Sequence, residues 1–154
     1  RDTDRSRGLG DVYKRQILSA PLLIGCDMSD IDDFTLSLLT NNEVIAVNQD
    51  PLAAPATKLL TDNGQIWYKK LYDGSYAVGF FQIDPYFILW DQDEAETIQM
   101  KTYDFELALK QLGITGKVSV RDLWRQKDLG EYNGEFRTQG PYHGVSFVKI
   151  TPVE

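Results

Sequence analysis

The sequence predicts two unlike parts: an α/β segment near the N-terminus and an all-β antiparallel sandwich that makes up most of the chain. In the first part, an apolar run from Ile17 to Ile24 is followed by an acidic turn and then by apolar residues at helical spacing, which together indicate one β/α unit. After Pro55, apolar and polar residues alternate in short runs between Gly-rich and Asp-rich turns. That spacing is typical of an antiparallel sandwich.

Residues 1–16 belong to neither part. They show no periodicity and few apolar groups, so we interpret them as a disordered tail or as foreign sequence, with a native segment as the alternative. Their net charge is +2, which leaves −9 on the remaining residues. A body this acidic, without a basic stripe, argues against nucleic-acid binding, and no apolar run reaches the ~18 residues that suggest a membrane span.

The β/α unit is expected in residues 17–52. A buried strand is predicted after Pro21, because proline would interrupt the ladder. Ser29 or Asp30 is the predicted cap of the following helix, whose first-turn carboxylates suit its positive end, and Asn41 is a predicted stop. The apolar stripe of this helix consists of Ile31, Phe34 and Leu38. One such unit cannot bury its apolar surface alone, so we expect it to need further strands.

The sandwich is expected in residues 57–154. Its strongest signal is a hairpin in which the runs 65–71 and 75–81 flank Asp73-Gly74. Further strands are predicted near Ile98–Met100, Val118–Val120 and Val145–Ile150, with a turn region from Asp104 to Gly113 and a loop from Trp124 to Gly130.

Two segments of the first part resemble a known family. Pro21–Asp27 (PLLIGCD) and Asn42–Leu52 (NEVIAVNQDPL) look like the end of the catalytic barrel in melibiase-type α-galactosidases, family 27 of the glycoside hydrolases. Val120–Trp124 (VRDLW) resembles the C-terminal sandwich of that family. The resemblance extends over about residues 17–152, with a departure at Ala53, where the family usually has glycine.

The resemblance implies that residues 17–52 are the last unit of a (β/α)₈ barrel of ~250 residues. It also implies a retaining hydrolase that releases terminal α-D-galactose from galactosides. The family's two catalytic aspartates lie on upstream barrel strands and have no counterpart here, so we expect no catalytic residue in this chain and no activity of the chain alone.

The same resemblance implies an α-galactoside as the partner of the full-length protein. From the residues themselves we expect no cofactor, no metal, and neither nucleic acid nor membrane as a partner. Specificity for β-L-arabinopyranosides or α-N-acetylgalactosaminides stays open, as do the oligomeric state and the compartment. A secreted or periplasmic location would fit.

Asp27 is the one candidate site residue. It ends the predicted barrel strand, on the side where such barrels place their sites. This position predicts that Asp27 supports the substrate pocket, and the simpler alternative is a cap for the next helix.

Other polar groups have simpler structural explanations. The acids at 30–33 suit a first helical turn, and those at 91–96 lack the Gly and Glu positions of an EF-hand loop. His143 has no serine in a G-x-S-x-G elbow as a partner, and Cys26 fits a buried small hydrophobe.

The three tryptophans, Trp67, Trp90 and Trp124, are expected mainly in packing roles, with stacking on sugar rings as the alternative. That alternative defines a competing function, a non-catalytic carbohydrate-binding sandwich module. Such a module does not account for residues 17–52, whose apolar side chains, Phe34 and Leu38 among them, would face water without a barrel to cover them.

Overall fold

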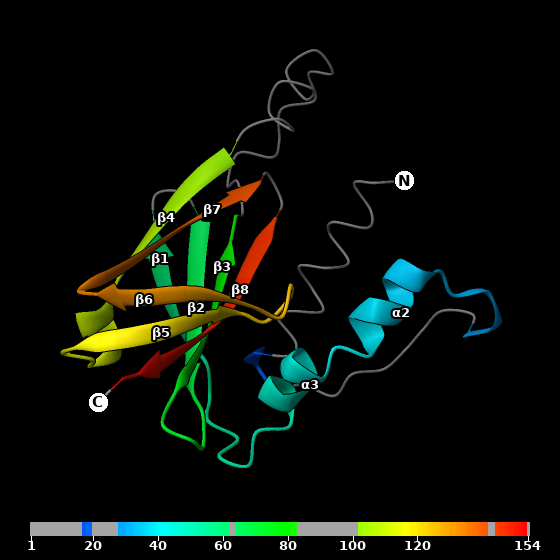
Figure 1. Ribbon diagram of the computed structural model, residues 1–154, viewed down its shortest axis with the longest axis horizontal. Coiled ribbons are helices and arrows are strands. Elements are labelled where there is room, and N and C mark those ends of the chain that lie inside the picture. The colour runs from blue at the N-terminus through cyan, green and yellow to red at the C-terminus, as the bar shows by residue number, and fades with distance from the viewer. Residues whose placement is uncertain (1–16, 20–27, 62–63, 83–101, 142–143, 154) are drawn as a thin grey trace.

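The computed structural model describes residues 17–19, 28–61, 64–82, 102–141 and 144–153. The elements that lie wholly in these ranges are two α-helices, eight strands and two short 3₁₀ helices (Figure 1). The helices are α2 (Asp33–Leu39), α3 (Asn42–Asn48) and the 3₁₀ turns Met28–Asp30 and Leu109–Leu112. The strands are β1 (Thr57–Thr61), β2 (Gly64–Lys70), β3 (Tyr76–Phe81), β4 (Thr102–Ala108), β5 (Lys117–Asp122), β6 (Lys127–Asn133), β7 (Glu135–Pro141) and β8 (Val145–Pro152).

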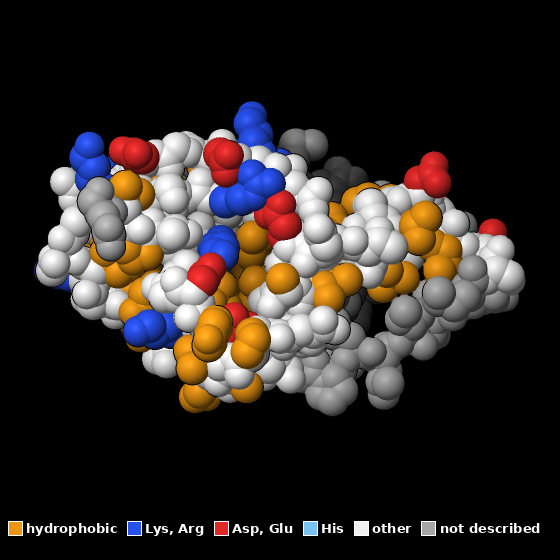
Figure 2. Space-filling view, turned by 60° about the horizontal axis from the view of Figure 1, so that its bottom comes forward, with side chains coloured by type: hydrophobic (Ala, Val, Ile, Leu, Met, Phe, Trp, Pro, Cys, Tyr) orange, Lys and Arg blue, Asp and Glu red, His pale blue; other side chains and the backbone are white. Residues whose placement is uncertain are grey.

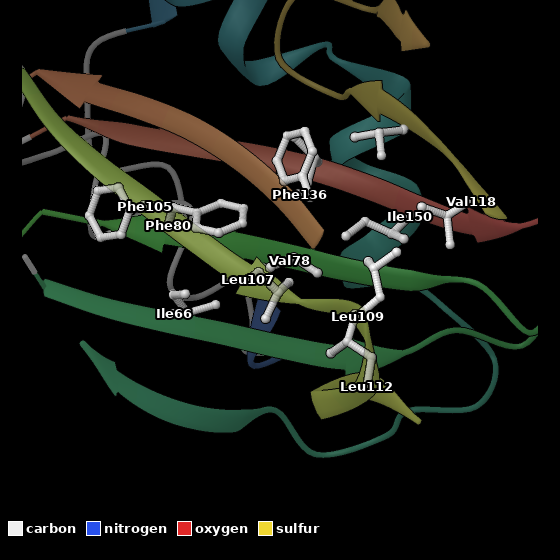
Figure 3. Close-up of a cluster of buried hydrophobic side chains, with 12 residues drawn as sticks. Ile66, Val78, Phe80, Phe105, Leu107, Leu109, Leu112, Val118, Phe136 and Ile150 are labelled. Carbon is white, nitrogen blue, oxygen red and sulfur yellow. The ribbon is translucent and has the colours of Figure 1, made fainter. Parts of the chain in front are cut away.

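The strands form two antiparallel sheets that pack face to face. The larger sheet has the order β1-β2-β3-β8-β5-β6, and the smaller pairs β4 with β7. Apolar side chains from both sheets meet in one buried cluster (Figure 3). This cluster includes Ile66, Val78, Phe80, Phe105, Leu107, Phe136 and Ile150. The packing confirms the predicted antiparallel sandwich.

The larger sheet is also covered on its second face, by α3 and by Ile17. A second buried cluster lies there, made of Ile17, Val44, Val47, Leu71, Ala77, Phe81, Leu123 and Phe147. Since neighbouring residues of a strand point to opposite faces, β3 contributes to both clusters, with Val78 and Phe80 in the first and Ala77 and Phe81 in the second. The run YAVGFF is therefore a central strand with two buried faces.

Both helices begin at a polar cap. The side chains of Asp32 and Asn41 accept a hydrogen bond from the backbone N–H three residues ahead, at 2.7 and 3.2 Å, which satisfies an otherwise unpaired donor. The predicted cap at Ser29 or Asp30 is wrong, because residues 28–30 form a separate 3₁₀ turn. The predicted stop at Asn41 is close, because α2 ends at Leu39 with Thr40 as its C-cap. Asn41 is then the N-cap of α3, a helix that the sequence pattern does not indicate.

The hairpin is confirmed, with β2 and β3 in register from Gln65 opposite Phe81 to Lys70 opposite Tyr76. The strands predicted at 118–120 and 145–150 are confirmed as parts of β5 and β8. The strand predicted near residues 98–100 lies outside the described residues. So does the strand predicted after Pro21, and the barrel unit stays a prediction.

Two other sequence predictions are wrong in part. The turn region expected from Asp104 to Gly113 begins as strand β4 and turns only at the 3₁₀ helix that ends at Leu112. The loop expected from Trp124 to Gly130 is shorter, because β6 starts at Lys127. β6 has no buried residue, so no apolar pattern marks it. β4 does alternate, with Phe105 and Leu107 buried, but the acidic residues beside them favour the turn prediction.

Ala53 has a left-handed backbone conformation, with φ of 45°, at the position where the resembling family usually has glycine. This conformation costs an L-residue about 1–2 kcal/mol. Glycine adopts it without that cost, but the greater conformational freedom of glycine in the unfolded chain cancels roughly half of the gain in stability. We expect Ala53→Gly to raise the free energy of unfolding by about 0.5–1 kcal/mol, measured by urea titration. The neighbouring, partly buried Ala54→Gly serves as the control, and a loss of stability in Ala53→Gly would contradict the expectation.

Candidate functional site

Several long-range polar contacts of the described chain lie where the helices meet the larger sheet. We call this region the helix–sheet seam: α2, α3 and the β5–β6 turn at residues 123–126. In Figure 2, Lys and Arg side chains lie over the sheets, while hydrophobic and acidic side chains lie over the helical part at the right. The sequence agrees, since residues 17–57 contain no Lys or Arg.

Asn41 is the central residue of the seam and is 7% exposed. Its Nδ2 donates to the backbone carbonyl oxygens of Leu123 and Trp124, at 3.0 and 3.3 Å, while its Oδ1 accepts the capping hydrogen bond of α3. One amide thus satisfies a helix end and two carbonyl groups of the turn. Buried polar groups are costly unless paired in this way.

Arg121 connects α3 to the sheet by charge. Its Nε and Nη2 donate to both carboxylate oxygens of Glu43 at 2.8 and 2.7 Å, and its Nη1 donates to Asp128 at 2.9 Å. The hydrogen bond with Glu43 is the main cause that raises the pKa of the Arg121 guanidinium above its ordinary value. The paired geometry fixes the orientation of α3 more than it adds stability, because half-exposed ion pairs contribute little.

The turn at residues 123–126 is held by Asp122. This carboxylate, 8% exposed, accepts from the backbone N–H groups of Trp124 and Arg125, both at 2.9 Å, and from the Arg125 guanidinium. Gln126 then takes a left-handed conformation with φ of 52°, and its Nε2 donates to Asn42 at 2.9 Å. The turn is therefore fixed from both sides.

Hollows open at several places on the described surface, among them the following three. A groove of about 380 Å³ lies at the seam, lined by Phe34, Ser37, Thr40, Asn41, Trp124 and Gln126. A cleft of about 570 Å³ lies between α3 and the β2–β3 turn, with Val47, Leu71 and Leu123 among the apolar residues and Glu43, Asp73, Arg121 and Lys149 among the charged ones. A third, of about 670 Å³, adjoins Thr61 and the outer strands β4 and β7.

Lys69 is almost fully buried, at 1% exposure. Its Nζ donates to the Ser19 hydroxyl at 2.7 Å, so β2 contacts the segment that precedes α2. Burial lowers the pKa of this ammonium, and the nearby Asp50 carboxylate opposes that effect.

Asp73 gives the chain a pH-dependent contact at the hairpin. Burial raises the pKa of its carboxyl, but hydrogen bonds from Lys149, at 2.6 Å, and from Ser75 outweigh burial and lower it to about 2. A lowered pKa stabilises the fold above the unfolded-state value of 3.8. We expect the stability difference between the protein and Asp73→Asn to shrink as pH falls from about 4 to 2. Urea titrations at each pH measure it, and a constant difference would contradict the ion-pair explanation.

Most of the sequence-predicted candidates lie outside the described residues: Asp27, Cys26, Trp90, His143 and the acids at 91–96. Of the acids at 30–33, Asp32 caps α2 and Asp33 lies in its first turn, as expected for a solvated helix start. Trp67 packs against the second cluster. Trp124 packs there too, but it also lines the seam groove, which the packing explanation alone did not predict.

Sequence reasoning missed Asn41 and Arg121 as residues that join the two parts. The only signal for Asn41 was its fitness to end or start a helix, and its contacts with residues 123 and 124 are long-range. Among the residues that the structure describes, no group of three His, Cys, Asp or Glu side chains is arranged to hold a metal ion. Neither described helix has the length or apolarity needed to cross a lipid bilayer.

The sequence matches the family model described as the α-galactosidase C-terminal β-sandwich domain over residues 61–150. A Dictyostelium discoideum protein named "Probable alpha-galactosidase" is 36% identical over 141 residues, covering 88% of this chain and 33% of that protein. Alpha-galactosidase 3 of Arabidopsis thaliana is 34% identical over 141 residues, covering 88% of this chain and 29% of that protein. The chain thus spans about a third of the length of these relatives.

Solved structures agree. A β-L-arabinopyranosidase of glycoside hydrolase family 27 from Geobacillus stearothermophilus superposes with a TM-score of 0.79 at 27% identity, covering 96% of this chain and 30% of that chain. Alpha-galactosidase I from Mortierella vinacea has a TM-score of 0.77 at 23% identity, covering 94% of this chain and 35% of that chain. The second likeness shows the fold alone.

Proposed function

This chain belongs to the melibiase-type α-galactosidases of glycoside hydrolase family 27, as a C-terminal part, and we propose that it serves a retaining hydrolase that releases terminal α-D-galactose. The 36% identity with the Dictyostelium protein, which extends over 141 residues, is the observation that carries the proposal. Such similarity includes residues of both the helical part and the sandwich. Retention in these enzymes uses two carboxylates about 5–5.5 Å apart, which we expect on strands with no counterpart in this chain.

Within such an enzyme, we propose that this chain fixes the last unit of the catalytic barrel. Asn41, Arg121 and the second apolar cluster hold α3 against the sheet. A helix held in this way would fix the segment that precedes it, including Asp27 at the end of the predicted strand. Catalysis is sensitive to such placement, because small displacements of supporting residues lower rates strongly.

A free-standing carbohydrate-binding module, residues 57–154 alone, is the weaker function. Five members of the second cluster belong to that range: Leu71, Ala77, Phe81, Leu123 and Phe147. Without α3 and Ile17 they would face water, which is unfavourable for a soluble monomer.

We propose galactose as the sugar that the enzyme releases, because the curated relatives are named as α-galactosidases. One structural neighbour is named as a β-L-arabinopyranosidase, so the experiment also tests that specificity.

A chimera tests the proposal. Residues 17–154 replace the matched segment of the Dictyostelium protein, and hydrolysis of aryl α-galactosides and aryl β-L-arabinopyranosides is measured. We expect α-galactoside turnover by the chimera and none by the chain alone. A matched chimera that receives only residues 57–154 keeps the original helical part as the control. Turnover by the chain alone, or a folded chimera without any α-galactosidase activity, would contradict the proposal.

Asp27 is tested in the same chimera. If its carboxylate supports the pocket, Asp27→Asn lowers turnover while the unfolding midpoint stays unchanged, because asparagine keeps the shape and the capping oxygen but not the charge. The control is Asp33→Asn, which alters an acid in the first turn of α2. An unchanged rate in Asp27→Asn leaves only a capping role.

A further inference from the structure

The turn between β6 and β7 contains an asparagine followed by a glycine. Asn133 is the last residue of β6, and Gly134 is the single residue before β7 begins at Glu135. Both residues of this Asn-Gly pair are exposed, and the turn lies at the end of the sandwich away from α2 and α3 (Figure 1). A barrel packed on the helical part would therefore leave this turn accessible to water.

The backbone nitrogen of Gly134 is open to reaction. Glycine has no Cβ atom, and among the described residues other than its chain neighbours none has a heavy atom within 4 Å of the place where a Cβ would stand. The Gly134 carbonyl oxygen accepts from the Leu109 N–H at 2.9 Å, whereas its own N–H donates no hydrogen bond to any described residue. The side-chain amide of Asn133 is thus followed by an unhindered, unpaired backbone nitrogen.

Strand β6 opposes little the rotation that brings these two groups together. It lies at the end of the larger sheet, and none of its residues is buried. Segments with few buried contacts open locally at low free-energy cost. The side chain of Asn133 can therefore turn toward the Gly134 nitrogen without disturbing either apolar cluster.

We propose that Asn133 is a site of spontaneous modification, at which the side-chain amide becomes a carboxyl group. The Gly134 backbone nitrogen forms a bond to Cγ of Asn133, the Cγ–Nδ2 bond breaks, and Nδ2 leaves as ammonia with the proton that the backbone nitrogen gives up. Water then opens the resulting imide ring. Attack at Cγ yields aspartate, and attack at the backbone carbonyl carbon yields isoaspartate, whose main chain runs through Cγ.

The two products affect the sandwich differently. Aspartate keeps the backbone and places a carboxylate directly opposite Lys117 on β5, where opposite charges attract across strands. Isoaspartate adds one carbon to the backbone between β6 and β7. The longer turn displaces the Gly134 carbonyl from Leu109 and shifts the first residues of β7 against β4. Isoaspartate, but not aspartate, therefore loosens the smaller sheet.

Peptide mapping of the 154-residue chain tests the site. The folded chain is kept at neutral pH and physiological temperature, and trypsin then releases residues 128–137, in which Asn133 is the only asparagine. We expect this peptide to acquire the mass of the carboxyl form over days, as a mixture of aspartate and isoaspartate that electron-transfer fragmentation distinguishes. The asparagines of α3, Asn42 and Asn48, should keep their amides.

The pair Asn63-Gly64 is the matched control within the same chain. Gly64 belongs to β2, is paired with Thr61, and its carbonyl oxygen accepts from the Thr61 hydroxyl at 3.1 Å. We expect Asn133 to convert several-fold faster than Asn63 in the folded chain, and the two to convert at similar rates in urea, where the fold no longer distinguishes them. The tryptic peptide 59–69, in which Asn63 is the only asparagine, reports the second rate.

Urea titration tests the effect on the sandwich. Asn133→Asp, which carries the charge on an unchanged backbone, should unfold at the midpoint of the fresh protein or above it. The isoaspartate form, separated from the aged protein by chromatography, should unfold at a lower midpoint. Equal rates at Asn133 and Asn63 in the folded chain, or retention of the amide at Asn133, would overturn the site. An unchanged midpoint of the isoaspartate form would overturn its effect on β7.

Discussion

Replacement of Asn41 by alanine is expected to lower the free energy of unfolding by about 2–4 kcal/mol. The change removes the cap of α3, worth about 1 kcal/mol, and leaves the carbonyl groups of Leu123 and Trp124 without their donor. Unpaired buried acceptors cost about 1–3 kcal/mol. Urea titration followed by circular dichroism measures the loss.

Asn41→Asp separates the two contributions. Aspartate still caps α3, but its ionised carboxylate cannot donate to the two carbonyl groups and is repelled by them. This variant should therefore be at least as unstable as Asn41→Ala at neutral pH and should recover as acid protonates the new carboxyl, whose pKa the site raises. A loss below about 0.5 kcal/mol in Asn41→Ala, the range of neutral surface changes, would mean that these contacts do not hold the helices.

Phe80→Ala is expected to cost more, about 3–5 kcal/mol, the usual range for a fully buried aromatic ring. Phe80 is 0% exposed and lies with its ring centroid 5.8 Å from those of both Phe105 and Phe136 (Figure 3). Because Phe105 and Phe136 come from the smaller sheet, loss of the Phe80 ring opens a cavity between the two layers.

The matched control for Phe80→Ala is Tyr72→Ala, which removes an aromatic ring that is 74% exposed. A surface substitution of this kind should change stability by no more than about 0.5 kcal/mol. Equal losses in the two variants, measured by urea titration, would mean that the interface between the sheets is not the main apolar core.

The sequence predicted the sandwich because its central strands carry strong local signals. In β2 and β3 the alternation surrounds a turn of Asp73 and Gly74, and the pairing observed is the one that this turn sets. The two missed strands differ in their signal. β6 has no buried residue, so no apolar period marks it. β4 does alternate, with Phe105 and Leu107 buried, but Asp104 favours a turn as readily as the solvent face of a strand.

The candidate site was less predictable from sequence. Asn41 and Trp124 are 83 positions apart, and only the folded chain brings them together. Residue type alone does not determine the role of Trp124, because this side chain packs against the second cluster and also lines the seam groove. The position of Asp27 rests on the family resemblance and lies outside the described residues.

The order of strands in the larger sheet has a consequence for how the chain matures. β8 comes after every other described strand, yet it lies between β3 and β5 and joins them. During synthesis the two halves, β1-β2-β3 and β5-β6, must therefore wait for β8 to leave the ribosome. Until then the flanks of β3 and β5 offer unpaired backbone to other chains, which makes this interval the one in which a chaperone would matter most.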